Sequence, residues 1–222
     1  MDNPKFSRLP SHIGIIPDGN RRWAEQNGYT KEKGYSYGIE PGLKAYKTCV
    51  ELGIPEITFY GFTQDNTKRP SLQTQAFQQA CVDSVRLLES YNADLFVVGN
   101  TKAPMFPEAL KPYANKRTNL GKNGIRVNFL VNYSWNWDLL HAFAREPGRT
   151  QANILNSIGS SQISRIDLVI RWGGRRRLSG FLPVQTIYSD FFIIDELWPD
   201  YTDDQLLQAL SWYQFQDITL GG

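Results

Sequence analysis

Short apolar runs alternate with polar loops and longer amphipathic segments along the chain. The runs are rich in β-branched and aromatic residues and are too short for helices, so they are predicted to be buried strands. They cover residues 13–16, 56–62, 94–98, 125–131 and 166–170. Helices are predicted from the first loop to about Asn27, over 36–52 and 72–91, within 103–124, from Trp135, and over 202–216 with Thr202 as N-cap.

The repeated order of strand, loop and helix predicts an α/β fold with a central, mostly parallel sheet flanked by helices. Ligands of such sheets bind outside the carboxyl ends of the strands, where the polar loops of this chain lie. Residues 166–170 are the last clear strand, and 191–194 form a further short apolar segment. Residues 1–222 are expected to form a single domain, with residues 1–11 as a loose lead-in.

The loop that follows the first strand has the features of an anion site. Gly19 permits a tight turn, and the free backbone N–H groups of the next helix point into it. Arg21 and Arg22 add positive charge, so the expected occupant is a phosphate or a diphosphate. Asp18 lies where a divalent metal could bridge carboxylate and phosphate oxygens. An ordinary surface turn with incidental arginines remains the alternative.

A second basic loop, RWGGRRRLS at residues 171–179, follows the strand at 166–170. Guanidinium groups bind phosphate oxygens in pairs, and glycines let backbone amides approach them, so this loop could hold a second diphosphate. A charge run on a solvated face is the alternative. The loop at 63–70 is also polar and basic.

Composition narrows the class of protein without identifying it. The chain is 13% aromatic and 21% charged, as in globular proteins, and its formal net charge of +2 is too small to indicate nucleic-acid binding. Cys49 and Cys81 lie in apolar helical patterns and are expected to be reduced core residues. Residues 146–165, rich in Ser, Gly and Asn, are expected to be mobile. No signal peptide or transmembrane run is recognised, so a soluble cytoplasmic protein is expected.

Taken together, the loops resemble those of the cis-prenyltransferase family, of the undecaprenyl diphosphate synthase type. The matching pieces occur in the family's order and spacing and cover nearly the whole chain. They are HIGIIPDGNRRWA at 12–24, FTQDNTKRP at 62–70, NY at 132–133 followed by WD at 137–138, IRWGGRRRLSGF at 170–181, and LWPDY at 197–201.

The resemblance implies a homodimer of α/β subunits, each with a hydrophobic tunnel. It also implies the condensation of an allylic prenyl diphosphate with isopentenyl diphosphate, with Mg²⁺, to form a cis double bond. Asp18, Asn20 and Asn66 match catalytic positions, the asparagines near the proton that isopentenyl diphosphate loses, and Asp18 and Asp190 match metal ligands. The allylic diphosphate site is matched by Gly19, Arg21, Arg22 and Arg69, and the second diphosphate site by Arg171, Arg177 and Ser179, with Arg175 beside them.

The allylic carbocation of such a reaction needs a dry wall with aromatic faces, which stabilise cations. Trp23, Tyr60, Phe62 and Trp135 are candidates for this cavity, although each could equally be plain core. Three glutamines in the helix at 72–91 are polar for the lining of a long-chain tunnel, which favours a short product unless they face outward. They are Gln75, Gln78 and Gln79.

Several positions depart from the family pattern. Arg175 stands in place of the glutamate of a GGE triplet, and Ser134 and Trp135 in place of a glycine pair. Tyr35, Thr67 and Thr219 replace a histidine, a tryptophan and an arginine. Three functions therefore stay open: ordinary cis elongation, irregular head-to-middle coupling or cyclisation of allylic diphosphates, and an inert partner subunit of a heteromeric synthase. The retained aspartates argue against the inert subunit.

Overall fold

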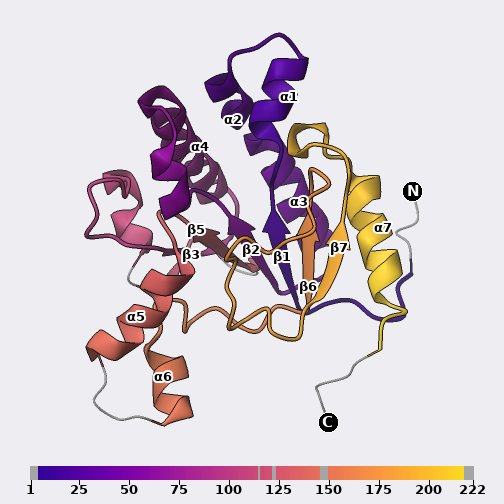
Figure 1. Cartoon of the computed structure of the whole chain (residues 1–222). Helices are drawn as coiled ribbons and strands as arrows, with labels where there is room; N and C mark the ends of the chain where they lie inside the picture. The colour runs from indigo at the N-terminus through magenta and orange to yellow at the C-terminus, as the bar shows by residue number, and fades with distance from the viewer. Residues whose placement is uncertain (1–4, 115, 122–123, 146–149, 218–222) are drawn as a thin grey trace.

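The computed structural model describes residues 5–114, 116–121, 124–145 and 150–217. Seven strands within these residues form one sheet: β1 (His12–Ile16), β2 (Glu56–Tyr60), β3 (Asp94–Val98), β4 (Thr118–Asn119), β5 (Arg126–Leu130), β6 (Leu168–Arg171) and β7 (Asp190–Ile193). Their order is β4-β3-β5-β2-β1-β6-β7 (Figure 1), and only β3 and β4 pair in the antiparallel direction. The predicted mostly parallel α/β sheet is confirmed.

The helices lie between the strands in sequence, as the predicted alternation requires. Their bounds are α1 (Asn20–Gln26), α2 (Gly34–Tyr37), α3 (Ile39–Glu51), α4 (Ser71–Glu89), α5 (Trp135–Arg145), α6 (Gln151–Ser157) and α7 (Asp203–Tyr213). Short 3₁₀ helices are η1 (Lys31–Lys33), η2 (Gln64–Lys68), η3 (Glu108–Tyr113) and η4 (Trp198–Asp200). Thr202 caps α7 in a capping box with Gln205, which confirms the predicted N-cap.

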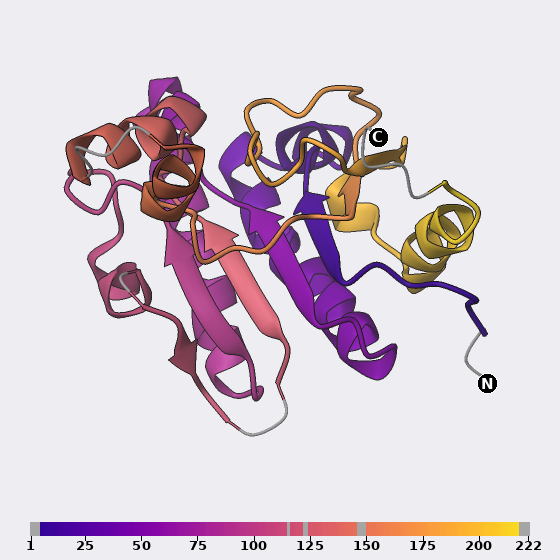
Figure 2. The same cartoon turned by 90° about the horizontal axis from the view of Figure 1, so that it is seen from below.

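Alternating side chains of the strands divide the core into two layers. Ile13 and Ile15 of β1 belong to the larger apolar cluster, which includes buried residues of α3, α4 and α7. Ile16 belongs to a smaller cluster on the other face, with Phe181 and neighbouring residues. Figure 2 shows α7 beside β7 at one edge of the sheet, with α5 and α6 toward the other edge. The parallel strands are therefore covered on both faces, as their nearly continuous apolar sequences indicate.

The helix predicted over 36–52 is divided into α2 and α3. Pro41 has no N–H to donate to the Tyr37 carbonyl, so the turn between them lacks one helical hydrogen bond. At the same turn, the Gly38 carbonyl accepts a hydrogen bond from Trp198 Nε1 at 2.8 Å. The break brings α2 to the carboxyl end of the sheet, on the same side as α1 (Figure 1).

The sheet also extends beyond the predicted strands. Residues 191–193 of the apolar segment at 191–194 belong to β7, which pairs with β6 in parallel, so 166–170 is not the last strand. The two-residue β4 was not predicted, because a strand this short leaves no pattern in the sequence.

Residues 5–11, expected to be a loose lead-in, are held against α7. Arg8 Nη2 donates to the carbonyls of Tyr213 and Gln216, both at 2.6 Å. Cys49 and Cys81 are buried free thiols, as predicted. The loop expected to be mobile contains α6 at residues 151–157, while residues 146–149 and Thr219 lie outside the described residues. In the part of the chain that the structure describes, no helix has both the length and the apolar character needed to cross a bilayer.

Candidate functional site

The loop after β1 is fixed by a glycine that no other residue could replace without strain. Gly19 has φ +113°, in the left-handed region, and a Cβ at this position would lie 2.8 Å from the Leu197 side chain. The carbonyl of Asp18 accepts a hydrogen bond from Trp198 N at 3.0 Å. The backbone at residues 18–19 is therefore held against residues 197–198, and the Asp18 carboxylate points to the carboxyl end of the sheet.

Arg171 joins the two loops that the sequence predicts to bind anions. It ends β6, is paired with Ile16 in the register of β1, and is only 4% exposed. Its Nη2 donates to Asp18 Oδ2 at 2.7 Å, and its Nη1 donates to Ser179 Oγ at 3.0 Å and to the Arg177 carbonyl. One buried guanidinium therefore orients the Asp18 carboxylate and the end of the second basic loop together.

Gly173 lets the two loops approach each other. Its φ is +84°, and a Cβ there would lie 2.4 Å from Arg22 Nη2. Arg22 Nη2 donates to the Gly173 carbonyl at 2.9 Å and lies 3.6 Å from Asp18 Oδ1. Arg22 is thus a bridge between the loops as well as a cation at the site.

A third group of residues centres on Arg69, in the loop after β2, and includes Arg21 of α1 and Tyr35 of α2. Arg69 lines the same cavity as Arg21, and burial, with Arg21 nearby, lowers the pKa of Arg69 below its ordinary value. Its Nη1 donates to the Tyr35 hydroxyl at 2.8 Å, and Arg21 Nη1 donates to Gln73 Oε1 at 3.3 Å. Among the described residues, no carboxylate lies within ion-pair distance of either guanidinium. Two partly desolvated cations are available here for an anion.

These three groups surround one cavity of about 590 Å³. It lies at the carboxyl ends of the central strands, as predicted for a parallel sheet. Its acidic side chains are Asp18, Glu25 and Asp65, and its basic side chains are Arg21, Arg22, Lys31, Arg69, Arg171, Arg175 and Arg177. The excess of basic groups makes the cavity complementary to strongly anionic ligands such as diphosphates. Gly19, Asn20, Asn66 and Ser179 also line it, so all the predicted catalytic and diphosphate-binding residues come together here. The second predicted metal ligand, Asp190, does not line this cavity.

Asp190 lies at the opposite end of the sheet. The register of β7 pairs it with Leu168 at the amino end of β6, whereas Arg171, which binds Asp18, ends that strand about 10 Å further along. Burial raises the pKa of Asp190, and the charges that act on it are those of Arg8 and Asp167. The expectation that Asp190 and Asp18 share a metal is therefore not met within one subunit.

The residues at the cavity could still hold Mg²⁺ with one carboxylate. Within the described part of the chain, no group of three His, Cys, Asp or Glu side chains is arranged to bind a metal. Asp18 is 33% exposed, and within the described part of the chain its Oδ1 has only the 3.6 Å contact with Arg22, so this oxygen retains free lone pairs. Mg²⁺ is commonly bound by one or two carboxylates together with substrate phosphates, which fits Asp18 beside a diphosphate.

The aromatic candidates are separated by the structure. Tyr60 lines the cavity, and its hydroxyl donates to the Ser179 carbonyl at 2.8 Å. Trp23 lies outside it in a surface cluster with Tyr29 and Tyr37, and its Nε1 donates to Asp200. Phe62 is fully buried core, and Trp135 covers Gly180 beside a neighbouring cavity of about 630 Å³. The pattern of apolar and polar positions in the sequence could not show which of these aromatic side chains line the cavity and which belong to the core.

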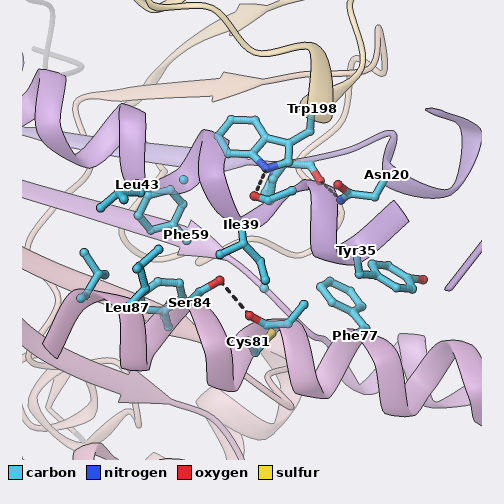
Figure 3. Close-up of a pocket in the computed structure, with 17 residues that line it drawn as sticks. Asn20, Tyr35, Ile39, Leu43, Phe59, Phe77, Cys81, Ser84, Leu87 and Trp198 are labelled. Atoms are coloured by element: carbon cyan, nitrogen blue, oxygen red, sulfur yellow. Dashed lines mark hydrogen bonds between the residues drawn. The ribbon is translucent and has the colours of Figure 1, made fainter. Parts of the chain in front are cut away.

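An apolar cavity lies directly behind this basic cavity. Figure 3 shows it between α3, α4 and the sheet, with Trp198, Phe59 and Leu87 around it. Its volume is about 70 Å³, which is small for the tunnel that the resemblance implies.

Three residues that line the cavities were not predicted as site residues. They are Glu25 of α1, Lys31 of η1 and Phe77 of α4, which reach the cavities only in the folded chain.

Comparisons with known proteins identify relatives along nearly the whole chain. The family profile described as "Putative undecaprenyl diphosphate synthase" matches residues 16–221. An undecaprenyl diphosphate synthase of Buchnera aphidicola, described as specific for (2E,6E)-farnesyl diphosphate, is 32% identical over 95% of this chain and 91% of its own length. An isoprenyl transferase of Oceanobacillus iheyensis is 29% identical over 98% of this chain and 92% of its own.

The fold has a close counterpart among solved structures. Lavandulyl diphosphate synthase from Lavandula x intermedia, solved with dimethylallyl diphosphate, superposes with a TM-score of 0.83 over 96% of this chain and 99% of that one, at 23% identity. At 23% identity, this similarity supports the fold alone. The profile and the sequence relatives show that the chain belongs to the undecaprenyl diphosphate synthase family and is a prenyltransferase.

Proposed function

We propose that this chain condenses an allylic prenyl diphosphate with isopentenyl diphosphate to give a short cis-prenyl diphosphate. The observation that carries the proposal is the position of Asp18 between two sets of arginines in one cavity. One set follows β1 and β2 and consists of Arg21, Arg22 and Arg69. The other set lies at the end of β6 and in the loop after it, and consists of Arg171, Arg175 and Arg177. Two diphosphate sites that share one carboxylate are what this condensation requires.

In the proposed reaction, the allylic carbon–oxygen bond breaks and both electrons leave with the diphosphate. Arg21 and Arg69 stabilise the charge that grows on the leaving group, because they are partly desolvated and have no carboxylate partner among the described residues. Arg171 and Ser179 hold the diphosphate of the second substrate, so that its double bond lies near the allylic cation. Mg²⁺ bound by Asp18 and the allylic diphosphate would supply further positive charge for the same leaving group.

A carbon–carbon bond then forms, and the second substrate loses a proton as the new double bond is made. The carboxamides of Asn20 and Asn66 are too weakly basic to take this proton, so we assign them a positioning role and assign the proton to an oxygen of the released diphosphate. Asn66 Oδ1 already accepts from Thr63 N at 2.9 Å, whereas Asn20 Oδ1 is buried without a hydrogen-bond partner among the residues that the structure describes. Asn20 therefore has a free acceptor at the wall of the cavity.

The proposal is tested by mass spectrometry of the products. The full chain is incubated with Mg²⁺ and allylic diphosphates of increasing length, each with and without isopentenyl diphosphate. Products that grow by one isoprene unit only when isopentenyl diphosphate is present would support elongation. Branched or cyclic products without it would replace elongation by irregular coupling or cyclisation, and no product in either condition would favour the inert partner subunit.

Arg175 is the residue that favours irregular coupling as a second candidate. It is exposed and lines the cavity beside Arg177, where a guanidinium can bind a second diphosphate. We expect Arg175→Glu to change the ratio of kcat/KM for isopentenyl and dimethylallyl diphosphates as second substrates by about tenfold, because a favourable charge becomes repulsive. Competition between the two substrates measures this ratio, with Arg176→Glu on the same loop as the control. An unchanged ratio would remove Arg175 from the site.

We also propose a homodimer, in which the exposed apolar face of α5 forms the interface. Leu140 and Phe143 of α5 are 62% and 72% exposed, and they lie one turn apart on the same helix face. Phe143→Glu is expected to convert the dimer to a monomer, measured by light scattering. Phe215→Glu, at an equally exposed phenylalanine near the end of α7, is the matched control. A dimer that survives Phe143→Glu would place the interface elsewhere.

A further inference from the structure

The basic cavity of about 590 Å³ and the apolar cavity behind it share one wall. The residues that line both are Pro17, Asn20, Tyr35, Gly61 and Phe77. Tyr35 comes from α2 and Phe77 from α4, and their rings are stacked, with centroids 4.5 Å apart and planes 6° apart. Figure 3 shows the two rings together at one end of the apolar cavity. Tyr35 is only 4% exposed, so the ring pair fills the space between the two helices.

Arg69 contacts this ring pair from the side of the basic cavity. Its Nη1 donates to the Tyr35 hydroxyl at 2.8 Å, and its guanidinium lies 5.7 Å from the centroid of the Phe77 ring. One cation therefore contacts both rings. The same guanidinium lines the basic cavity, where a diphosphate is proposed to bind.

A diphosphate would compete with Tyr35 for Arg69. Burial raises the pKa of the Tyr35 hydroxyl, which therefore stays neutral. A neutral hydroxyl is a weaker partner for a guanidinium than a diphosphate, because the diphosphate carries the opposite charge and can accept two parallel hydrogen bonds from the guanidinium. Arg21, whose like charge destabilises Arg69, adds to the preference for an anion.

We infer that Tyr35, Phe77 and Arg69 form a closed neck between the two cavities, which opens when a diphosphate takes Arg69 from Tyr35. This inference rests on the proposed function, in which the basic cavity binds prenyl diphosphates. It makes Tyr35 and Phe77 specificity-determining residues, because a hydrocarbon chain enters the apolar cavity only past their rings. The small volume behind the neck, about 70 Å³, is the closed state of this passage.

Cys81 reports whether the neck is open. It lines the apolar cavity behind the ring pair, and burial raises the pKa of its thiol to about 12. Cys49 is also fully buried but does not line the cavity, so it is an internal control in the same chain. Both thiols are alkylated with iodoacetamide, with and without inorganic diphosphate and Mg²⁺, and peptide mass spectrometry measures the two rates.

We expect inorganic diphosphate to raise the alkylation rate of Cys81 about tenfold and to leave Cys49 unchanged, since the neck loses one hydrogen bond to a charged group. Tyr35→Phe keeps the ring stack but removes the hydroxyl that Arg69 binds. In this variant, Cys81 should react at the faster rate without diphosphate and should no longer respond to it. If the stack were ordinary core, Tyr35→Phe would change neither rate.

Chain selection gives an independent measurement. Phe77→Leu should raise kcat/KM for farnesyl diphosphate relative to dimethylallyl diphosphate about tenfold, because it removes one ring of the stack. Gln79→Leu, on the exposed side of α4, is the matched control and should leave the ratio unchanged. An unchanged ratio in Phe77→Leu would overturn the role of the ring pair.

Calorimetry with inorganic diphosphate separates the two proposals. Binding without a change in Cys81 alkylation would overturn the neck and leave the proposed function intact. No binding would overturn the proposed function together with the neck. Binding with faster Cys81 alkylation, lost in Tyr35→Phe, is the result expected.

Discussion

Asp18→Asn is expected to lower kcat by at least about 10³-fold, because the metal and diphosphate contacts of the carboxylate provide several kcal/mol of transition-state stabilisation. The substitution keeps an oxygen to accept the hydrogen bond from Arg171 Nη2, so the junction between the two loops is preserved. It removes the negative charge that would bind Mg²⁺. Steady-state product formation measures the loss.

The choice of asparagine keeps the experiment clear. Asp18→Ala would leave Arg171, which is 4% exposed, without its carboxylate partner and would lower stability as well as activity. Asp18→Asn should have a thermal transition close to that of the original chain. Asp217→Asn, at an exposed aspartate, is the matched control and should retain full activity. Undiminished turnover in Asp18→Asn would remove Asp18 from the reaction.

Arg171→Lys is expected to lower kcat/KM for the second substrate about 10²-fold. The Arg171 guanidinium binds Asp18, Ser179 and the Arg177 carbonyl at the same time, and a single ammonium cannot reproduce that planar arrangement. A positive charge remains beside Asp18, so the fold should be retained. Varying each substrate separately measures the loss and assigns it to the second diphosphate site.

Arg176→Lys is the matched control for this prediction. Arg176 belongs to the same loop, is exposed and does not line the cavity, so its replacement by lysine should leave both substrates unaffected. Equal losses for both substrates in Arg171→Lys would show that Arg171 acts mainly through Asp18. Full activity would show that the junction between the loops has no role in catalysis.

Motif positions that match the family do not all lie at the cavity. Tyr133 and Asp138, in the NY and WD pieces, form a buried pair in which the tyrosine hydroxyl donates to Asp138 Oδ2 at 2.9 Å. Asp138 also accepts from the backbone and the hydroxyl of Ser160, and burial raises its pKa. This motif therefore anchors residue 160 to the start of α5. A sequence match alone could not separate this structural role from a chemical one.

Local patterns were sufficient for five of the seven described strands and for most helices. Apolar runs of strand length between helical segments predicted the parallel sheet, since few arrangements bury such runs on both faces. They also predicted that Asp18, Arg69 and Arg171 would meet at the carboxyl ends, because parallel strands present those ends at one edge. The break between α2 and α3 was missed, although Pro41 signals it, because the apolar pattern continues through Gly38.

The sequence by itself determined the fold class and the positions of the basic loops that we propose to bind diphosphates, because these depend on local pattern and on the geometry of parallel strands. Only the tertiary structure decided which side chains share a cavity. The register of β7 separates Asp190 from Asp18, and the contact between α2 and α4 brings Tyr35 onto Phe77. Strand register and helix packing are set by contacts between residues far apart in sequence, and no local pattern records them.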